Sequence, residues 1–279
     1  MASALELPTV SSQLPPSAAS SSGATTPTAS PRGVASGRGV DWWTEAWRLF
    51  APAAGTWIVI LIVLFILNLV LAFVPVLGHI AGQLLLPVFS GGLMLGCRAI
   101  DRGERLTIEH LFAGFGAHFG PLLIVGAIYL GAIIAIMLVV FGLTMVFFGA
   151  TIVGSLWHLR SVADPLAIGS MLGGFLSAVL VASLIFLLLY LPLLMAVWFA
   201  PALIVLRGVE PLQAMRLSFD GCLRNVVPFL IYGLIGLLLA IVASIPLMLG
   251  WLVLGPVTIA SVYAGYCDIY EDQPVRPPA

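Results

Sequence analysis

Long apolar stretches dominate the pattern of hydrophobic and polar positions along this chain. Crossing the hydrocarbon of a bilayer takes roughly 20 apolar residues in a helix. The stretches of about that length predict six membrane helices, at about 53–74, 79–100, 119–147, 171–206, 227–248 and 250–267. The fourth stretch exceeds one crossing and contains Pro192 and Pro201, so we expect it to tilt, to kink or to lie partly outside the hydrocarbon.

Three shorter segments, each ahead of a pair of these stretches, place apolar residues at helical spacing. The apolar positions are Trp43, Trp47 and Phe50 in the first, Ile108, Leu111, Phe112 and Phe115 in the second, and Leu212, Met215, Phe219, Cys222 and Leu223 in the third. Such amphipathic helices commonly lie in the plane of the lipid headgroups. They are also compatible with amphipathic linkers that pack under the helical bundle, and we favour this second interpretation.

Part of the pattern recurs along the chain. The segment FAGFGAHFGPLLIVGAI (112–128) aligns with FDGCLRNVVPFLIYGLI (219–235), where Gly114 coincides with Gly221 and Pro121 with Pro228. Together with a weaker echo at AWRLF (46–50), this predicts a threefold repeat of one interfacial helix followed by two membrane helices. The fold class expected is therefore an all-α polytopic membrane protein.

The arginines predict the orientation. The chain has 11 basic residues, all arginine. With six helices, one side of the membrane receives both termini and Arg32, Arg38, Arg48, Arg98, Arg102, Arg105, Arg207, Arg216, Arg224 and Arg276. Arg160 alone falls on the other side. Because cytoplasmic loops carry the positive excess, both termini are expected in the cytoplasm and the protein in the inner membrane.

Composition supports this organisation and adds two tails. Charged residues make up 8% of the chain, against about 25% in soluble domains. Residues 1–40 are rich in Ser, Pro and Ala and predict a disordered tail, followed by a membrane domain at 41–272 and a short C-terminal tail at 273–279. A net charge of −1 gives no basic excess, so we expect no nucleic-acid partner. The expected partner is the bilayer; anionic lipids, a second membrane protein and a homo-oligomer stay open.

Candidate chemistry is sparse. No acidic or basic residue lies in the middle of a predicted span, where proton relays and intramembrane active sites place them. The residues considered and set aside as metal ligands or nucleophiles are His79, His110, His118, His158 and Ser90, together with Cys97, Cys222 and Cys267, which we expect to be reduced. We therefore predict no catalytic residue, no cofactor, no metal and no enzymatic activity. Asn68 and Gln83 are the best polar candidates within the spans, and we expect both to point into the bundle, where they form interhelical hydrogen bonds or contact a substrate.

Three segments carry a family resemblance. The residues from Trp47 to Phe50, LMLGCRAIDRGE (93–104) and SFDGCLRNVVPF (218–229) resemble a family of bacterial multi-pass membrane proteins of unknown function, over about 41–272. Ser218, Phe219, Asn225 and Pro228 are also similar to the membrane portion of some bacterial glycerophosphodiester phosphodiesterases, whose catalytic domain has no counterpart here. The resemblance implies architecture and transfers no active-site residue.

Two functions lead as hypotheses, and an enzyme, which would require His110 or His118 to converge with carboxylates, stands third. The first is a non-enzymatic protein whose arginine-rich face contacts lipid headgroups or a partner. The second is a transporter or channel for a small apolar or lipid-like solute, which predicts a cavity near Asn68 and Gln83.

Overall fold

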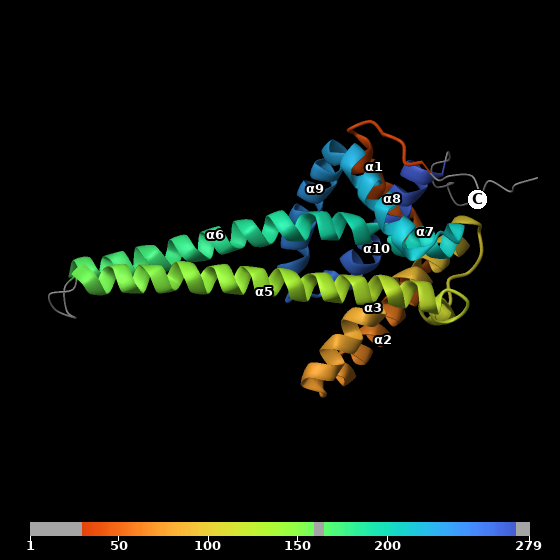
Figure 1. The fold of residues 1–279 in the computed structure, drawn as a ribbon. Helices are drawn as coiled ribbons and strands as arrows, with labels where there is room; N and C mark the ends of the chain where they lie inside the picture. Colours follow the sequence, from red (N-terminus) through yellow and green to blue (C-terminus); the bar gives the residue numbers. More distant parts are fainter. Residues whose placement is uncertain (1–29, 159–164, 272–279) are drawn as a thin grey trace, which may run out of the picture.

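The computed structural model describes residues 30–158 and 165–271, and within these ranges every regular element is a helix. The helices are α1 (Arg38–Phe50), α2 (Ala54–Ala72), α3 (Pro75–Asp101), α4 (Glu109–Phe112), α5 (Phe119–His158), α6 (Pro165–Trp198), α7 (Ala200–Arg207), α8 (Pro211–Arg224), α9 (Val226–Ser244) and α10 (Trp251–Tyr270), with short 3-10 turns at Ala51–Ala53 and Ala113–Phe115 (Figure 1). Arg160, Arg276 and the tail at 273–279 lie outside the described residues.

Six helical segments are long and apolar enough to cross a membrane, which confirms the all-α polytopic fold. They run over Arg38–Ala72, Pro75–Asp101, Phe119–Ala150, Leu172–Arg207, Val226–Ser244 and Trp251–Tyr270. Their outward faces are covered with exposed Leu, Ile, Val and Phe side chains, as hydrocarbon requires. α3 and α10 are the most buried of the six and form the centre of the bundle.

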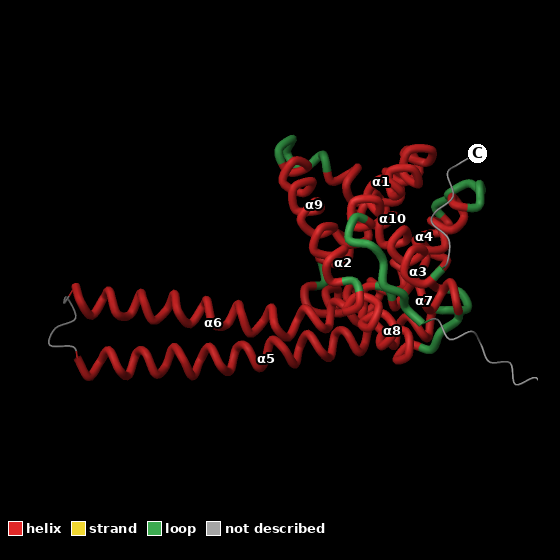
Figure 2. The backbone as a smooth tube through the Cα atoms, turned by 90° about the horizontal axis from the view of Figure 1, so that it is seen from above, coloured by secondary structure: helices red, strands yellow, loops and turns green. Residues whose placement is uncertain are grey.

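The membrane helices form three hairpins that diverge from one end of the molecule. The α5–α6 hairpin extends far beyond the others, and α2–α3 points in a different direction (Figures 1 and 2). The 40 residues of α5 correspond to about 60 Å of helix, roughly twice the hydrocarbon thickness. α9, with 19 residues, spans that thickness only once.

The fourth apolar stretch is a broken helix. Pro192 lies inside α6 without ending it, whereas the chain bends at Phe199 and resumes as α7 with Pro201 in its first turn. The break frees backbone groups that Ser218 of α8 satisfies: its hydroxyl accepts the N–H of Phe199 at 2.9 Å and donates to the carbonyl of Met195 at 2.6 Å. The predicted irregularity is therefore present, at Phe199.

The expected amphipathic helices are α1, α4 with its 3-10 turn, and α8. They gather at the end of the bundle where α10 finishes, which we call the terminal face. α1 turns Trp42 and Trp43 inward and leaves Trp47 about half exposed. Trp43 stacks on Tyr232 of α9 with ring centroids 4.8 Å apart. The element order matches the predicted plan of one short helix before each hairpin, and the threefold repeat stays a prediction.

Part of the predicted N-terminal tail is held against the bundle. Residues 1–29 lie outside the described ranges, but Arg32 donates its N–H to the carbonyl of Ile269 at 3.1 Å. The amide of Asn225, buried before α9, accepts the N–H of Val34 at 2.8 Å and donates to the carbonyl of Arg32 at 2.9 Å. Packed structure thus begins near Pro31, because these backbone groups find partners on α8, α9 and α10 that composition does not reveal.

Candidate functional site

A cavity of about 420 Å³ opens among the membrane helices, about halfway along α3. It is the feature of the described structure best suited to hold a small molecule, since most ligand sites are concave, mostly apolar and of this size. The lining residues come from α2, α3, α5, α6, α7 and α10: Leu64, Leu67, Asn68, Leu71, Gly82, Leu86, Pro87, Phe89, Ser90, Leu93, Met94, Tyr129, Tyr190, Leu194, Val197, Trp198, Pro201, Thr258, Ile259 and Val262.

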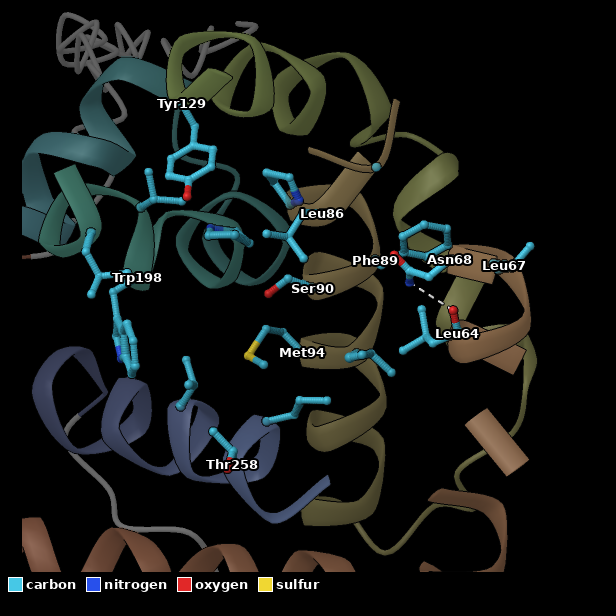
Figure 3. Close-up of a pocket in the computed structure, with 18 of the residues that line it drawn as sticks. Leu64, Leu67, Asn68, Leu86, Phe89, Ser90, Met94, Tyr129, Trp198 and Thr258 are labelled. Atoms are coloured by element: carbon cyan, nitrogen blue, oxygen red, sulfur yellow. Dashed lines mark hydrogen bonds between the residues drawn. The ribbon is translucent and has the colours of Figure 1, made fainter. Parts of the chain in front are cut away.

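The cavity wall is apolar with a few uncharged polar groups. Ser90 and Met94 point from α3 toward Trp198 and Thr258, and the hydroxyl of Tyr129 points into the same space (Figure 3). Tyr129 of α5 and Tyr190 of α6 both belong to the lining. None of the described residues that line the cavity is Asp, Glu, Lys, Arg or His. The site can therefore offer hydroxyl groups and apolar contact, but no charge.

Local sequence features explain why the helices leave space here. Next to the cavity, the backbones of α3 and α5 are in close contact. A Cβ on Gly126 would lie 2.4 Å from the carbonyl oxygen of Leu84. One turn before Ser90, Pro87 removes a backbone donor within α3. On the opposite wall the break between α6 and α7 places Trp198 and Pro201 at the cavity.

A second cavity of about 370 Å³ adjoins the first toward the α2–α3 turn. Asn68, His79, Gly82, Gln83 and Leu86 belong to its lining, and Asn68, Gly82 and Leu86 also line the first cavity. The two intramembrane amides singled out in the sequence therefore lie at cavities. Asn68 does not form the expected interhelical hydrogen bond. Its side chain is exposed, and its amide donates to the carbonyl of Leu64, one turn earlier in α2, at 2.9 Å.

A buried ionic cluster holds the terminal face together, and sequence reasoning missed it. Asp268, near the end of α10, accepts hydrogen bonds from Arg38 at 2.6 Å and from the indole of Trp42 at 3.0 Å. Arg38 also pairs with Glu45 at 2.8 Å, and Arg32 reaches Asp268 at 3.5 Å. Asp268 and Glu45 are each 6% exposed. An acidic residue at the end of an apolar stretch is the signal that could have pointed to Asp268.

The remaining candidates do not assemble into reactive chemistry in the described part of the chain. His110 accepts the N–H of its neighbour Thr107 at 3.1 Å, and no group of three metal-ligating side chains occurs among the described residues. Cys97, Cys222 and Cys267 are free and buried. Burial raises the pKa of the Cys222 thiol to about 12, which leaves it a poor nucleophile at neutral pH. Ser90, which the sequence offered as a possible nucleophile, lines the cavity.

Comparison with known proteins identifies the family. Residues 127–266, half of the chain, match the model of a domain of unknown function, DUF7847. The chain belongs to this family. This family is one of unknown function, and with its six apolar helices the chain is a multi-pass membrane protein, as the sequence resemblance implied.

A curated relative gives the cellular location. The chain is 28% identical over 249 residues to a probable inner membrane protein of Burkholderia thailandensis, covering 85% of this chain and 90% of the relative. No solved structure matches. With six apolar helices, this DUF7847 protein is a multi-pass inner-membrane protein. The comparisons indicate no enzyme family, and they give no support to the likeness to glycerophosphodiester phosphodiesterases.

Proposed function

We propose that this DUF7847 protein binds a lipid-like molecule with an uncharged polar end in the cavity beside Ser90 and Thr258, and carries it within or across the inner membrane without changing it chemically. The observation that supports this proposal is the cavity itself. A transporter or channel requires a cavity near Asn68 and Gln83, and the structure has two there. A solid core at this place would have favoured a protein that acts only through its surface.

The lining supports a particular class of ligand. An ionised group without a partner is costly to hold at this depth in a membrane, and the lining supplies no opposite charge. Apolar side chains from six helices suit an acyl or isoprenoid chain, and the hydroxyls of Ser90, Tyr129 and Tyr190 suit an alcohol, ester or amide. A lipid with a phosphate group in the cavity is therefore not expected.

The broken helix supports movement of the ligand. Discontinuous helices near the middle of the membrane border the substrate sites of many transporters, and the α6–α7 break borders this cavity. The residues that line the cavity also include no His or Cys that could pair with an acidic group, which supports a role without catalysis.

The proposal is tested by the lipids that leave the membrane with the protein. The native chain and two variants would be extracted in polymer nanodiscs, and their lipids identified by mass spectrometry. Ser90→Trp fills the cavity, whereas Leu238→Trp changes a side chain of α9 that is 58% exposed to lipid. We expect an uncharged lipid-like species to be enriched with the native chain and Leu238→Trp and to be lost from Ser90→Trp. Identical bulk lipid in all three samples would contradict the proposal.

A second candidate function is contact with anionic lipid headgroups at the terminal face. Arg48, Arg102, Arg105 and Arg216 are exposed and form no ion pair with another residue that the structure describes. Exposed apolar side chains of the amphipathic helices lie on the same face, among them Trp47, Phe112 and Leu212. Basic residues beside aromatic ones are typical of helices at a lipid interface.

This candidate is tested by charge removal. Substituting Arg48, Arg102, Arg105 and Arg216 together with Gln should reduce co-purification of phosphatidylglycerol by about a hundredfold or more, since each basic residue near the surface contributes about 1 kcal/mol. An unchanged amount of co-purified phosphatidylglycerol would exclude this candidate function.

The proposed orientation places both termini and the terminal face in the cytoplasm. Reporter fusions after residues 40, 104, 160, 209 and 275 should read as cytoplasmic at every point except 160. A periplasmic signal at 209 would contradict the orientation and the six-helix topology.

A further inference from the structure

The turn between α9 and α10, residues 245–250, exposes several large apolar side chains. Leu247 is 90% exposed, Ile245 75% and Met248 67%. From Asn225 to Cys267 the sequence contains no charged residue and no histidine. The connection between α5 and α6, by contrast, contains Arg160 and Asp164 in its sequence, at positions outside the described ranges.

The backbone of this turn is unusual for one that faces water. Leu247 and Met248 both have positive φ, at 52° and 64°. Turns in water usually place Gly, Asn or Asp at such positions, because a side chain with a Cβ is strained there. Two consecutive bulky apolar residues in left-handed conformation, both directed outward, indicate that their side chains contact something apolar.

The hydrogen bonds of the turn suit hydrocarbon. Four of the six residues donate their N–H to a carbonyl of the turn or of the end of α9: Ile245, Leu247, Met248 and Leu249. The first two residues of α10 donate to carbonyls of the turn. Pro246 has no N–H, so within this described turn Gly250 is the one donor left over. The indole of Trp251 donates to the hydroxyl of Ser244 at 3.1 Å. Backbone in hydrocarbon must satisfy its polar groups internally, and among the described residues this turn leaves one donor, the N–H of Gly250, and one carbonyl, that of Leu247, without a backbone partner.

Helix length places the turn near the far side of the bilayer. α9 starts directly after Arg224 and Asn225 at the terminal face and has 19 residues, about 28 Å of helix. The hydrocarbon is about 30 Å thick, and a tilted helix covers less than its own length. The turn therefore falls at or short of the far edge of the hydrocarbon.

We propose that the α9–α10 turn stays inserted among the acyl chains of the far leaflet and does not enter the periplasmic water. Leu247, Met248 and Leu249 then continue the lipid-facing surface of α9 and α10 across the turn, so this hairpin anchors the protein in the far leaflet without a polar loop. The partner of this surface is lipid acyl chain.

Spin labels test the depth of the turn in the bilayer. Leu247→Cys, Met248→Cys and Leu249→Cys would each be labelled in a variant without the three native cysteines and reconstituted in vesicles of phosphatidylethanolamine and phosphatidylglycerol. Leu237→Cys, on the lipid-facing side of α9, is the hydrocarbon control, and Asp220→Cys, exposed on α8, is the water control. Collision with oxygen and with a water-soluble nickel complex is then measured by electron paramagnetic resonance.

We expect the spin labels in the turn to collide with oxygen more often than with the nickel complex. The label at Leu237 should behave in the same way, and the label at Asp220 should show the opposite preference. Nickel collisions as frequent as at Asp220 would show the turn in water and overturn the proposal. Low collision with both reagents would mean that protein, such as a second copy of the chain, covers the turn, which also overturns it. Three neighbouring sites keep the test valid if one variant fails to fold.

Discussion

The hydroxyl of Ser218 bridges the break in the fourth membrane segment by accepting the N–H of Phe199 at 2.9 Å. The same hydroxyl donates to the carbonyl of Met195 at 2.6 Å, so one side chain of α8 satisfies backbone groups on both sides of the bend. Ser218 is fully buried, and the bend carries Trp198 into the wall of the cavity. A terminal-face helix thereby shapes a site within the membrane.

Replacing Ser218 with Ala should therefore destabilise the protein by about 1–3 kcal/mol, the cost of leaving buried polar groups without partners. Thermal unfolding in detergent, followed by size-exclusion chromatography, measures the change. Ser183→Ala is the matched control, because this exposed hydroxyl donates to the carbonyl of Val179 within its own helix. Equal melting temperatures for the two variants would argue against the bridging role.

Asp268→Asn should loosen the N-terminal segment. The substitution removes the buried negative charge that Arg38 and Arg32 share and leaves Arg38 with Glu45 and Asp41 as its acidic partners, which we expect to cost about 2 kcal/mol. Hydrogen exchange of residues 31–38 should become faster. Asp41→Asn, an exposed partner of the same Arg38, should change exchange little. Unaltered exchange in Asp268→Asn would show that the cluster does not hold this segment.

Gly126→Leu should disrupt the contact between α3 and α5 beside the cavity. Even a Cβ at this position would lie 2.4 Å from the carbonyl oxygen of Leu84, whereas a Cβ on Gly131 of the same helix meets nothing within 4 Å. We expect Gly126→Leu to lower the melting temperature by several degrees, through overpacking worth about 1–3 kcal/mol, and Gly131→Leu to leave it near the native value. A lower melting temperature for Gly131→Leu than for Gly126→Leu would mean that α5 packs against α3 in a different way.

Cys222 should resist modification across the physiological pH range. Its thiol pKa is raised by burial to about 12, and the reactive thiolate becomes abundant only as pH approaches that value. Maleimide labelling of the folded protein between pH 7 and 9, mapped by mass spectrometry, should leave Cys222 unmodified, while the unfolded chain labels readily. Rapid labelling of folded protein at pH 7 would show that α8 opens to solvent.

Much of the fold follows from the sequence because hydrocarbon accepts few alternatives. Apolar stretches of about one bilayer thickness predict the six membrane helices, although α5 continues past its predicted end at 147 to His158. Helical spacing of Trp43, Trp47 and Phe50 predicts α1. The exact break at Phe199 does not follow, since Pro192 is tolerated inside α6 and the bend depends on Ser218 of another helix.

The site was predictable only in part. Asn68 and Gln83 stand out as polar residues in apolar stretches, and both lie at cavities. The space itself depends on how Gly126, Pro87 and the α6–α7 break set the distances between helices, which no local pattern encodes. The burial of Asp268 likewise requires α1 to pack against the end of α10, a contact between opposite ends of the chain.

The central claim is that the cavity beside Ser90 holds an uncharged lipid-like molecule, and photo-cross-linking from the cavity wall tests it most directly. A diazirine amino acid would be placed at Ser90 and, as the control, at Leu238 on the lipid-facing side of α9, and the adducts formed in native membranes identified by mass spectrometry. We expect one uncharged lipid-like adduct to dominate at Ser90 and bulk phospholipid at Leu238. The same phospholipid adducts at both positions, or adducts at Ser90 to protein alone, would contradict the claim.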